Sequence, residues 1–122
     1  MKYSIDKQEK YTVLSLQEEN LNSVVAPNLK SELVILRNEG IENLILNLED
    51  VKFVDSSGLS AILTANRLWS DIGHFVLTGV EHSSVKKLIT ISRLDTILKI
   101  KGTLEESIDT IMMENLDKEL DN

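Results

Sequence analysis

Residues 43–63 read NLILNLEDVKFVDSSGLSAIL, and this segment is the most informative about the fold. It runs from an apolar segment at residues 43–48, through a short segment at 51–54, into the amphipathic segment that begins at Leu59. A nearly unbroken apolar run of this kind is typical of a central strand that is covered on both faces of a sheet. The residues Asp55-Ser56-Ser57-Gly58 are therefore predicted to lie where a strand leads into the N-terminus of a helix.

Two hydroxyl groups and a carboxylate are grouped at this junction. The first N–H groups of a helix have no partner within the helix, and its N-terminus carries a partial positive charge. Such an end holds an anion well, including a phosphate attached to serine. Helix capping by Ser or Asp alone is a simpler explanation, and each such cap contributes about 1 kcal/mol. Gly58 would also let another backbone segment approach closely.

The rest of the chain is typical of one compact unit. Its 122 residues are 42% hydrophobic, which suits a single domain with one core. The chain has a single proline, no internal repeat and no flexible linker. We therefore expect one domain over residues 1–122, with an ordered core at about residues 3–116 and a frayed tail at residues 117–122.

Strands and helices are predicted to alternate along the chain. Alternating apolar residues indicate strands near residues 3–5 and 12–16, and short apolar runs indicate strands at residues 75–77 and 97–100. Helical spacing follows the polar residues at 22–23, 55–58, 83–84 and 103. This order, ββαβαβαβα, predicts an α/β fold in which a mixed sheet of about four to five strands packs with about four helices.

Several polar residues are predicted to cap these helices. Asn22 or Ser23 would cap the first, Ser83 or Ser84 the third, and Thr103 with Glu106 would form a capping box for the last. Functional sites in such sheets gather at the C-terminal ends of the strands. The Asn22-Ser23 pair and the 55–58 junction both follow strands, so we expect them on one rim of the sheet.

Charge and composition argue against several classes of function. The formal net charge is −7, which disfavours direct binding to nucleic acid and to anionic membranes. Much of the excess acid lies on one predicted helix and its end, where a solvated face is expected: Glu105, Glu106, Asp109, Glu114, Asp117, Glu119 and Asp121. No apolar run approaches the roughly 20 residues that cross a bilayer. With no cysteine and no leader-like segment, we expect a cytoplasmic protein without membrane insertion.

Enzymatic and cofactor chemistry is not predicted. The glycines match no nucleotide-binding loop, and His74 and His82 show no metal-ligand spacing. A nucleophilic Ser56 would need a base, and the Gly-x-Ser-x-Gly elbow is absent. A small enzyme with Ser56 as its nucleophile remains an alternative. Met112 and Met113 are expected to pack in the core rather than to form a binding surface.

Residues 47–59, NLEDVKFVDSSGL, resemble the signature of the STAS domain family, and more narrowly that of the bacterial anti-sigma factor antagonists. The similarity in the order of elements extends from Tyr3 to about Leu116. The resemblance implies that Ser56, directly after the motif Asp, accepts phosphate from an anti-sigma factor that is also a serine kinase. The unphosphorylated protein would bind that anti-sigma factor and free a sigma factor, and a phosphatase would reverse the modification.

The resemblance also implies a partner-binding surface formed by Asn22, Ser23, Asp55, Ser57, Gly58 and Leu59. Family members often carry Gly-x-Leu-Asp after the second strand, and this chain has Glu19-Asn20-Leu21-Asn22. An amide therefore replaces a carboxylate at Asn22. That difference keeps a second interpretation open, in which the protein is a STAS interaction module of a transport or lipid-trafficking assembly and is never phosphorylated.

Overall fold

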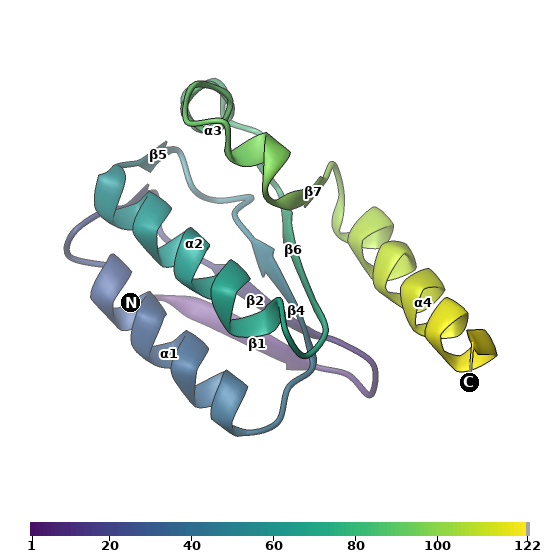
Figure 1. The fold of residues 1–122 in the computed structure, drawn as a ribbon. Helices are drawn as coiled ribbons and strands as arrows, with labels where there is room; N and C mark the ends of the chain where they lie inside the picture. The colour runs from purple at the N-terminus through teal and green to yellow at the C-terminus, as the bar shows by residue number, and fades with distance from the viewer. Residues whose placement is uncertain (122) are drawn as a thin grey trace.

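The computed structural model describes the backbone of residues 1–121 and the side chains of residues 1–117 and 120 (Figure 1). Its main sheet has five strands in the order β1-β2-β4-β6-β7. Only β1 is antiparallel to its neighbour, and the other strands run parallel to one another. The strands span Tyr3–Lys7 (β1), Thr12–Leu16 (β2), Asn43–Asn47 (β4), His74–Thr78 (β6) and Lys99–Lys101 (β7). The predicted α/β fold with a mixed sheet is confirmed.

The central strand β4 is buried on both faces, as its apolar sequence predicts. Leu44 and Leu46 point into the larger core, and Ile45 between them points into a smaller core on the opposite face. The helices α1 (Ala26–Asn38) and α2 (Ser56–Trp69) lie side by side over the larger core (Figure 1). Trp69 at the end of α2 is fully buried, and its indole N–H donates to the carbonyl of Ile41 at 2.9 Å.

The helix α4 (Leu104–Asp121) covers the smaller core on the other face of the sheet. It buries Ile111 against Val13, Ile45 and Val76. Met112 and Met113 are 44% and 59% exposed, so the prediction that they pack in the core is wrong. One sheet face covers a single stripe of a helix, and Ile111 occupies that stripe.

The acidic side chains of α4 are mostly exposed, but Glu114 is half-buried and contacts both His74 and Lys99. The helix continues through Asp121, and the fraying expected from residue 117 stays a prediction. The side chains of Glu119 and Asp121, and the whole of Asn122, lie outside the described residues. No helix in the described part of the chain is long and apolar enough to span a membrane.

Two of the predicted element boundaries in the second half of the chain differ from the structure, and a third prediction, the cap of the last helix, is confirmed. The helix α3 (Ser83–Ile91) has His82 as its N-cap without a side-chain cap, and the Ser84 hydroxyl instead donates to the carbonyl of Lys52. The last strand starts at Lys99 rather than Ile97, since the 3₁₀ turn η1 (Leu94–Thr96) precedes it. The Thr103 cap of α4 is confirmed, because its hydroxyl accepts the Glu106 N–H at 3.1 Å.

A second sheet of two very short parallel strands was not predicted. The strand β3 (Asn20–Leu21) pairs with β5 (Phe53–Val54), so that Asn20 faces Phe53 and Leu21 faces Val54. Strands of two residues are too short for the alternation that reveals a strand in a sequence. This small sheet brings together the two segments that lead into α1 and α2.

Candidate functional site

The two segments that lead into α1 and α2 are joined by backbone hydrogen bonds. The Glu19 carbonyl accepts the N–H groups of Lys52 and Phe53 at 2.8 and 3.0 Å, and the Leu21 carbonyl accepts the Asp55 N–H at 3.2 Å. These bonds continue the pairing of β3 with β5. The Asn22-Ser23 pair therefore lies beside the 55–58 junction, on one rim, as the sequence predicted.

Gly58 is the point of closest approach between these two segments. It is buried, and a Cβ atom built on it would lie 2.3 Å from the Leu21 carbonyl oxygen and 2.7 Å from Val54 Cγ1. No side chain fits in that space without moving the backbone of Leu21. Gly58 therefore has a structural role beneath the rim, where it lets α2 begin directly against β3.

Asp55, and not a serine, caps α2. Its backbone is extended, with φ −102° and ψ −172°, and its Oδ1 accepts the Gly58 N–H at 3.0 Å. Ser56 is the first residue of the helix and is exposed. Within the described residues the hydroxyls of Ser56 and Ser57 have no hydrogen-bond partner. Capping therefore explains Asp55 and leaves the Ser56 hydroxyl available for chemistry.

Asn22 organises the turn that leads into α1. Its side-chain Oδ1 accepts the N–H groups of Val24 and Val25 at 3.0 and 3.2 Å, and its carbonyl accepts the Ala26 N–H at 2.7 Å. The N-cap of α1 is Val25, which has no side-chain cap, so the prediction that Asn22 or Ser23 caps this helix is wrong; Asn22 instead closes the turn before it. An amide oxygen and a carboxylate oxygen can both accept these bonds, so Asn22 keeps the local geometry that an Asp would give.

A hollow of about 320 Å³ opens between the N-terminal halves of α1 and α2. It is lined by Ser23, Ala26, Pro27, Lys30, Ser56, Ser57 and Ser60. Lys30 is the charged residue of this lining, and its Nζ donates to Ser60 Oγ at 3.0 Å. Leu59, also predicted to bind a partner, is instead half-buried against the larger core.

Two exposed apolar side chains in the same segments were not picked out from the sequence. Val24 is 76% exposed and Phe53 is 53% exposed. The Phe53 ring lies 5.9 Å from the His82 ring, tilted by 50°. Successive residues of a strand point to opposite faces, so Val54 packs on the core and Phe53 faces outward. If β5 had been predicted as a strand, this alternation would have indicated that Phe53 is exposed.

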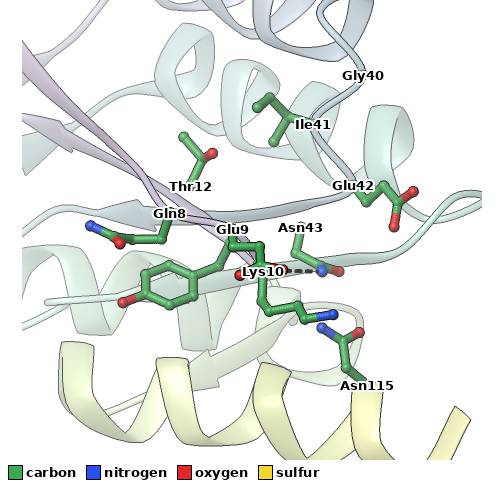
Figure 2. A pocket seen from close by; sticks show the side chains of 10 residues that line it. Gln8, Glu9, Lys10, Thr12, Gly40, Ile41, Glu42, Asn43 and Asn115 are labelled. Atoms are coloured by element: carbon green, nitrogen blue, oxygen red, sulfur yellow. Dashed lines mark hydrogen bonds between the residues drawn. The ribbon is translucent and has the colours of Figure 1, made fainter. Parts of the chain in front are cut away.

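A larger hollow of about 440 Å³ lies at the opposite end of the sheet, where β2 and β4 begin (Figure 2). Asn43 lies in its wall and is almost fully buried. Its Nδ2 donates to the Lys10 carbonyl at 2.8 Å, and its Oδ1 accepts the His74 N–H at 3.0 Å (Figure 2 shows the first bond). These bonds tie the β1–β2 turn, β4 and β6 together, so the Asn43 amide has a structural role.

The histidines are not placed to activate Ser56. His82 contacts Phe53 and Ser84, and His74 Nδ1 lies 2.6 Å from Glu114 Oε2 near the start of β6. Among the described residues, no hydrogen bond joins a histidine to Ser56. The described residues also contain no cluster of three or more His, Cys, Asp or Glu side chains that could hold a metal ion.

A family model of the STAS domain matches residues 2–107. The chain belongs to the STAS domain family. This STAS domain is 30% identical, over 74 residues, to a candidate anti-sigma factor antagonist of Thermotoga neapolitana. The aligned segment covers 61% of this chain and 66%, slightly less than two thirds, of that relative.

Solved structures of anti-sigma factor antagonists share the fold of this STAS domain. One is a candidate antagonist from Thermotoga maritima, 25% identical, with a TM-score of 0.79 over 90% of this chain and 94% of the other. Another is the antagonist SpoIIAA in its unphosphorylated form, 21% identical, with a TM-score of 0.76 over 91% and 96% of the two chains. The phosphorylated form of the Bacillus protein SpoIIAA also matches, at a TM-score of 0.68 over 90% and 99%.

Proposed function

We propose that this STAS domain is an anti-sigma factor antagonist, and that phosphorylation of Ser56 ends its binding to the anti-sigma factor. The main support for this function is that Asp55 alone caps α2. The exposed Ser56 hydroxyl at the helix start has no hydrogen-bond partner among the described residues. The names of the relatives support the same function. In this proposal the anti-sigma factor is also the serine kinase, a phosphatase restores Ser56, and all three proteins act in the cytoplasm.

The chemistry of the rim suits a switch that changes charge without refolding the domain. Phosphorylation adds a charge of about −1.5 to −2 at one point. The N-terminus of α2 tolerates an anion there, because its free N–H groups and the helix dipole both favour negative charge. SpoIIAA has been solved in both forms, and both match the fold of this chain. The added charge would act on the partner rather than on the fold.

The surface around Ser56 suits a protein partner. Protein interfaces combine apolar anchor residues with a polar rim. Val24 and Phe53 are exposed apolar side chains in the same two segments as the polar residues Ser23, Ser56 and Ser57. We propose that these side chains contact the partner, while Asn22, Asp55, Gly58 and Leu59 hold the surface in shape. A charge buried in such a contact costs several kcal/mol of desolvation, which is sufficient to end binding.

Binding of charge variants tests this function. The cognate anti-sigma factor would be captured from the native cells and its affinity measured for Ser56→Ala and Ser56→Asp. The matched control is Ser83→Asp, because Ser83 is likewise an exposed first residue of a helix, α3. We expect Ser56→Ala and Ser83→Asp to bind like the unmodified protein, and Ser56→Asp to bind at least about tenfold more weakly, equivalent to about 1.4 kcal/mol.

Other results would favour the other interpretations. Equal binding by Ser56→Ala and Ser56→Asp would contradict charge as the switch. Capture of transport or lipid-trafficking components in place of an anti-sigma factor would indicate the unphosphorylated interaction module. Covalent labelling of Ser56 by a serine-reactive probe would indicate a nucleophilic enzyme, and we expect no labelling because no base contacts Ser56 among the described residues.

A further inference from the structure

Lys30 lies in the hollow beside Ser56 and has no carboxylate partner among the described residues. It is half-buried on α1, and the hydrogen bond from its Nζ to Ser60 Oγ is 3.0 Å long. A half-buried ammonium group is stabilised by a nearby anion. The other side chains that line this hollow are uncharged serine, alanine and proline. Lys30 is therefore a cation in a pocket that contains no anion until Ser56 is modified.

The spacing along α2 places Lys30 within reach of a phosphate on Ser56. Ser56 and Ser60 are four residues apart on α2, and such residues lie on one face with their Cβ atoms about 6 Å apart. The Lys30 ammonium already contacts the Ser60 hydroxyl, one turn from Ser56. Lysine has a flexible four-carbon stem with three donor hydrogens, so it can turn from Ser60 to a phosphate oxygen without a change in the backbone.

We propose that Lys30 binds the phosphate of phosphorylated Ser56 and holds it in the hollow between α1 and α2. This inference rests on the proposed phosphorylation and adds a receiving site to it. The charge-assisted bond would join α1 to α2, and the phosphate would occupy space that is open in the unphosphorylated domain. Phosphorylation would then fill the hollow, so that the partner could no longer contact it, in addition to adding charge.

The ionisation of the phosphate itself tests this site without any partner protein. Phosphoserine would be incorporated genetically at position 56 of the full chain, and its second ionisation followed by phosphorus NMR. An ammonium group at the phosphate lowers its second pKa below the ordinary value of about 6. We expect a low pKa in the parent protein, a rise in Lys30→Gln and retention of the low pKa in Lys30→Arg. Lys87→Gln, an exposed lysine on α3, is the control and should leave the pKa unchanged.

A second measurement shows whether the phosphate joins the two helices. We expect phosphorylation to raise the melting temperature of the parent protein more than that of Lys30→Gln. The helix N-terminus acts equally on the phosphate in both proteins, so the difference isolates Lys30. An identical phosphate pKa in the parent, Lys30→Gln and Lys87→Gln proteins would overturn the inference.

These outcomes are separate from those of the function test. If Lys30 shifts the phosphate pKa but Ser56→Asp binds the anti-sigma factor as Ser56→Ala does, the phosphate site stands and charge at Ser56 is not the switch. If Ser56→Asp weakens binding to the anti-sigma factor but Lys30→Gln leaves the phosphate pKa unchanged, the function stands and the phosphate site fails.

Discussion

Gly58 and Leu21 approach so closely that a Cβ atom on Gly58 would lie 2.3 Å from the Leu21 carbonyl oxygen. This contact lies directly below the rim that carries Ser56. It brings the start of α2 against β3, and so sets the positions of the segments before α1 and α2 relative to each other. Packing thus accounts for the glycine of the Asp-Ser-Ser-Gly block. It does not account for the two serines, for which a functional role is proposed.

Replacement of Gly58 tests this packing. Gly58→Ala should lower the free energy of unfolding by about 1–3 kcal/mol, because the added methyl group forces the Leu21 backbone to move. Urea denaturation measures the loss. The control is Gly102→Ala, where the nearest atom to an added Cβ is Glu106 Oε1 at 3.7 Å, and no loss is expected. Equal stability of the Gly58→Ala and parent proteins would show that the close approach does not constrain the rim.

Replacement of Asp55 and of Ser56 shows which of the two residues stabilises the start of α2. Asp55→Ala removes the acceptor of the Gly58 N–H and should cost about 1 kcal/mol of stability, whereas Asp55→Asn should retain most of it. Ser56→Ala should change stability by less than about 0.5 kcal/mol, since its hydroxyl has no partner among the described residues. Thermal unfolding of the three variants measures both effects. A larger loss from Ser56→Ala than from Asp55→Ala would mean that the serine is the cap.

The exposed ring of Phe53 should matter for binding and little for stability. Phe53→Ala is expected to weaken binding to the anti-sigma factor by about tenfold, the usual effect of truncating an aromatic anchor. Ile97→Ala is the matched control, because Ile97 is exposed to a similar extent, 59% against 53%, but precedes β7 away from the rim. Titration calorimetry compares the two variants. Equal affinities would exclude Phe53 from the partner surface.

The contacts of Glu114 should hold α4 on the sheet. Glu114 lies 2.6 Å from His74 Nδ1 on β6, and it also pairs with Lys99 on β7. Because these groups are partly exposed, Glu114→Gln should lower stability by only about 1 kcal/mol, and salt should reduce the difference. Urea denaturation at low and high salt measures this, with the exposed Asp109→Asn as control. A loss that is independent of salt would argue against an electrostatic contact.

Local patterns in the sequence were sufficient to predict the main sheet and the helix junction. The buried run at residues 43–48 is continuous and apolar, so it identified β4 as a central strand with both faces covered. The Thr103 cap of α4 follows from residue type and position. Such features depend only on residues that are close in the sequence, so they can be predicted without a structure.

Features that depend on packing between distant segments could not be predicted in this way. The Ser84 hydroxyl donates to Lys52 rather than capping its own helix, and that contact exists only because the chain brings α3 to β5. The position of Lys30 beside Ser56 likewise depends on the packing of α1 on α2. Met112 and Met113 were misassigned because α4 carries more apolar residues than one face of the sheet can cover.

Phosphosite mapping shows whether Ser56 is the residue that accepts phosphate. The protein and its Ser56→Ala variant would be incubated with the cognate anti-sigma kinase and ATP, and the modified residues identified by mass spectrometry. The proposed function predicts phosphate on Ser56 of the parent protein and none on the variant. Phosphate found only at other residues, to the same extent in both proteins, would contradict it.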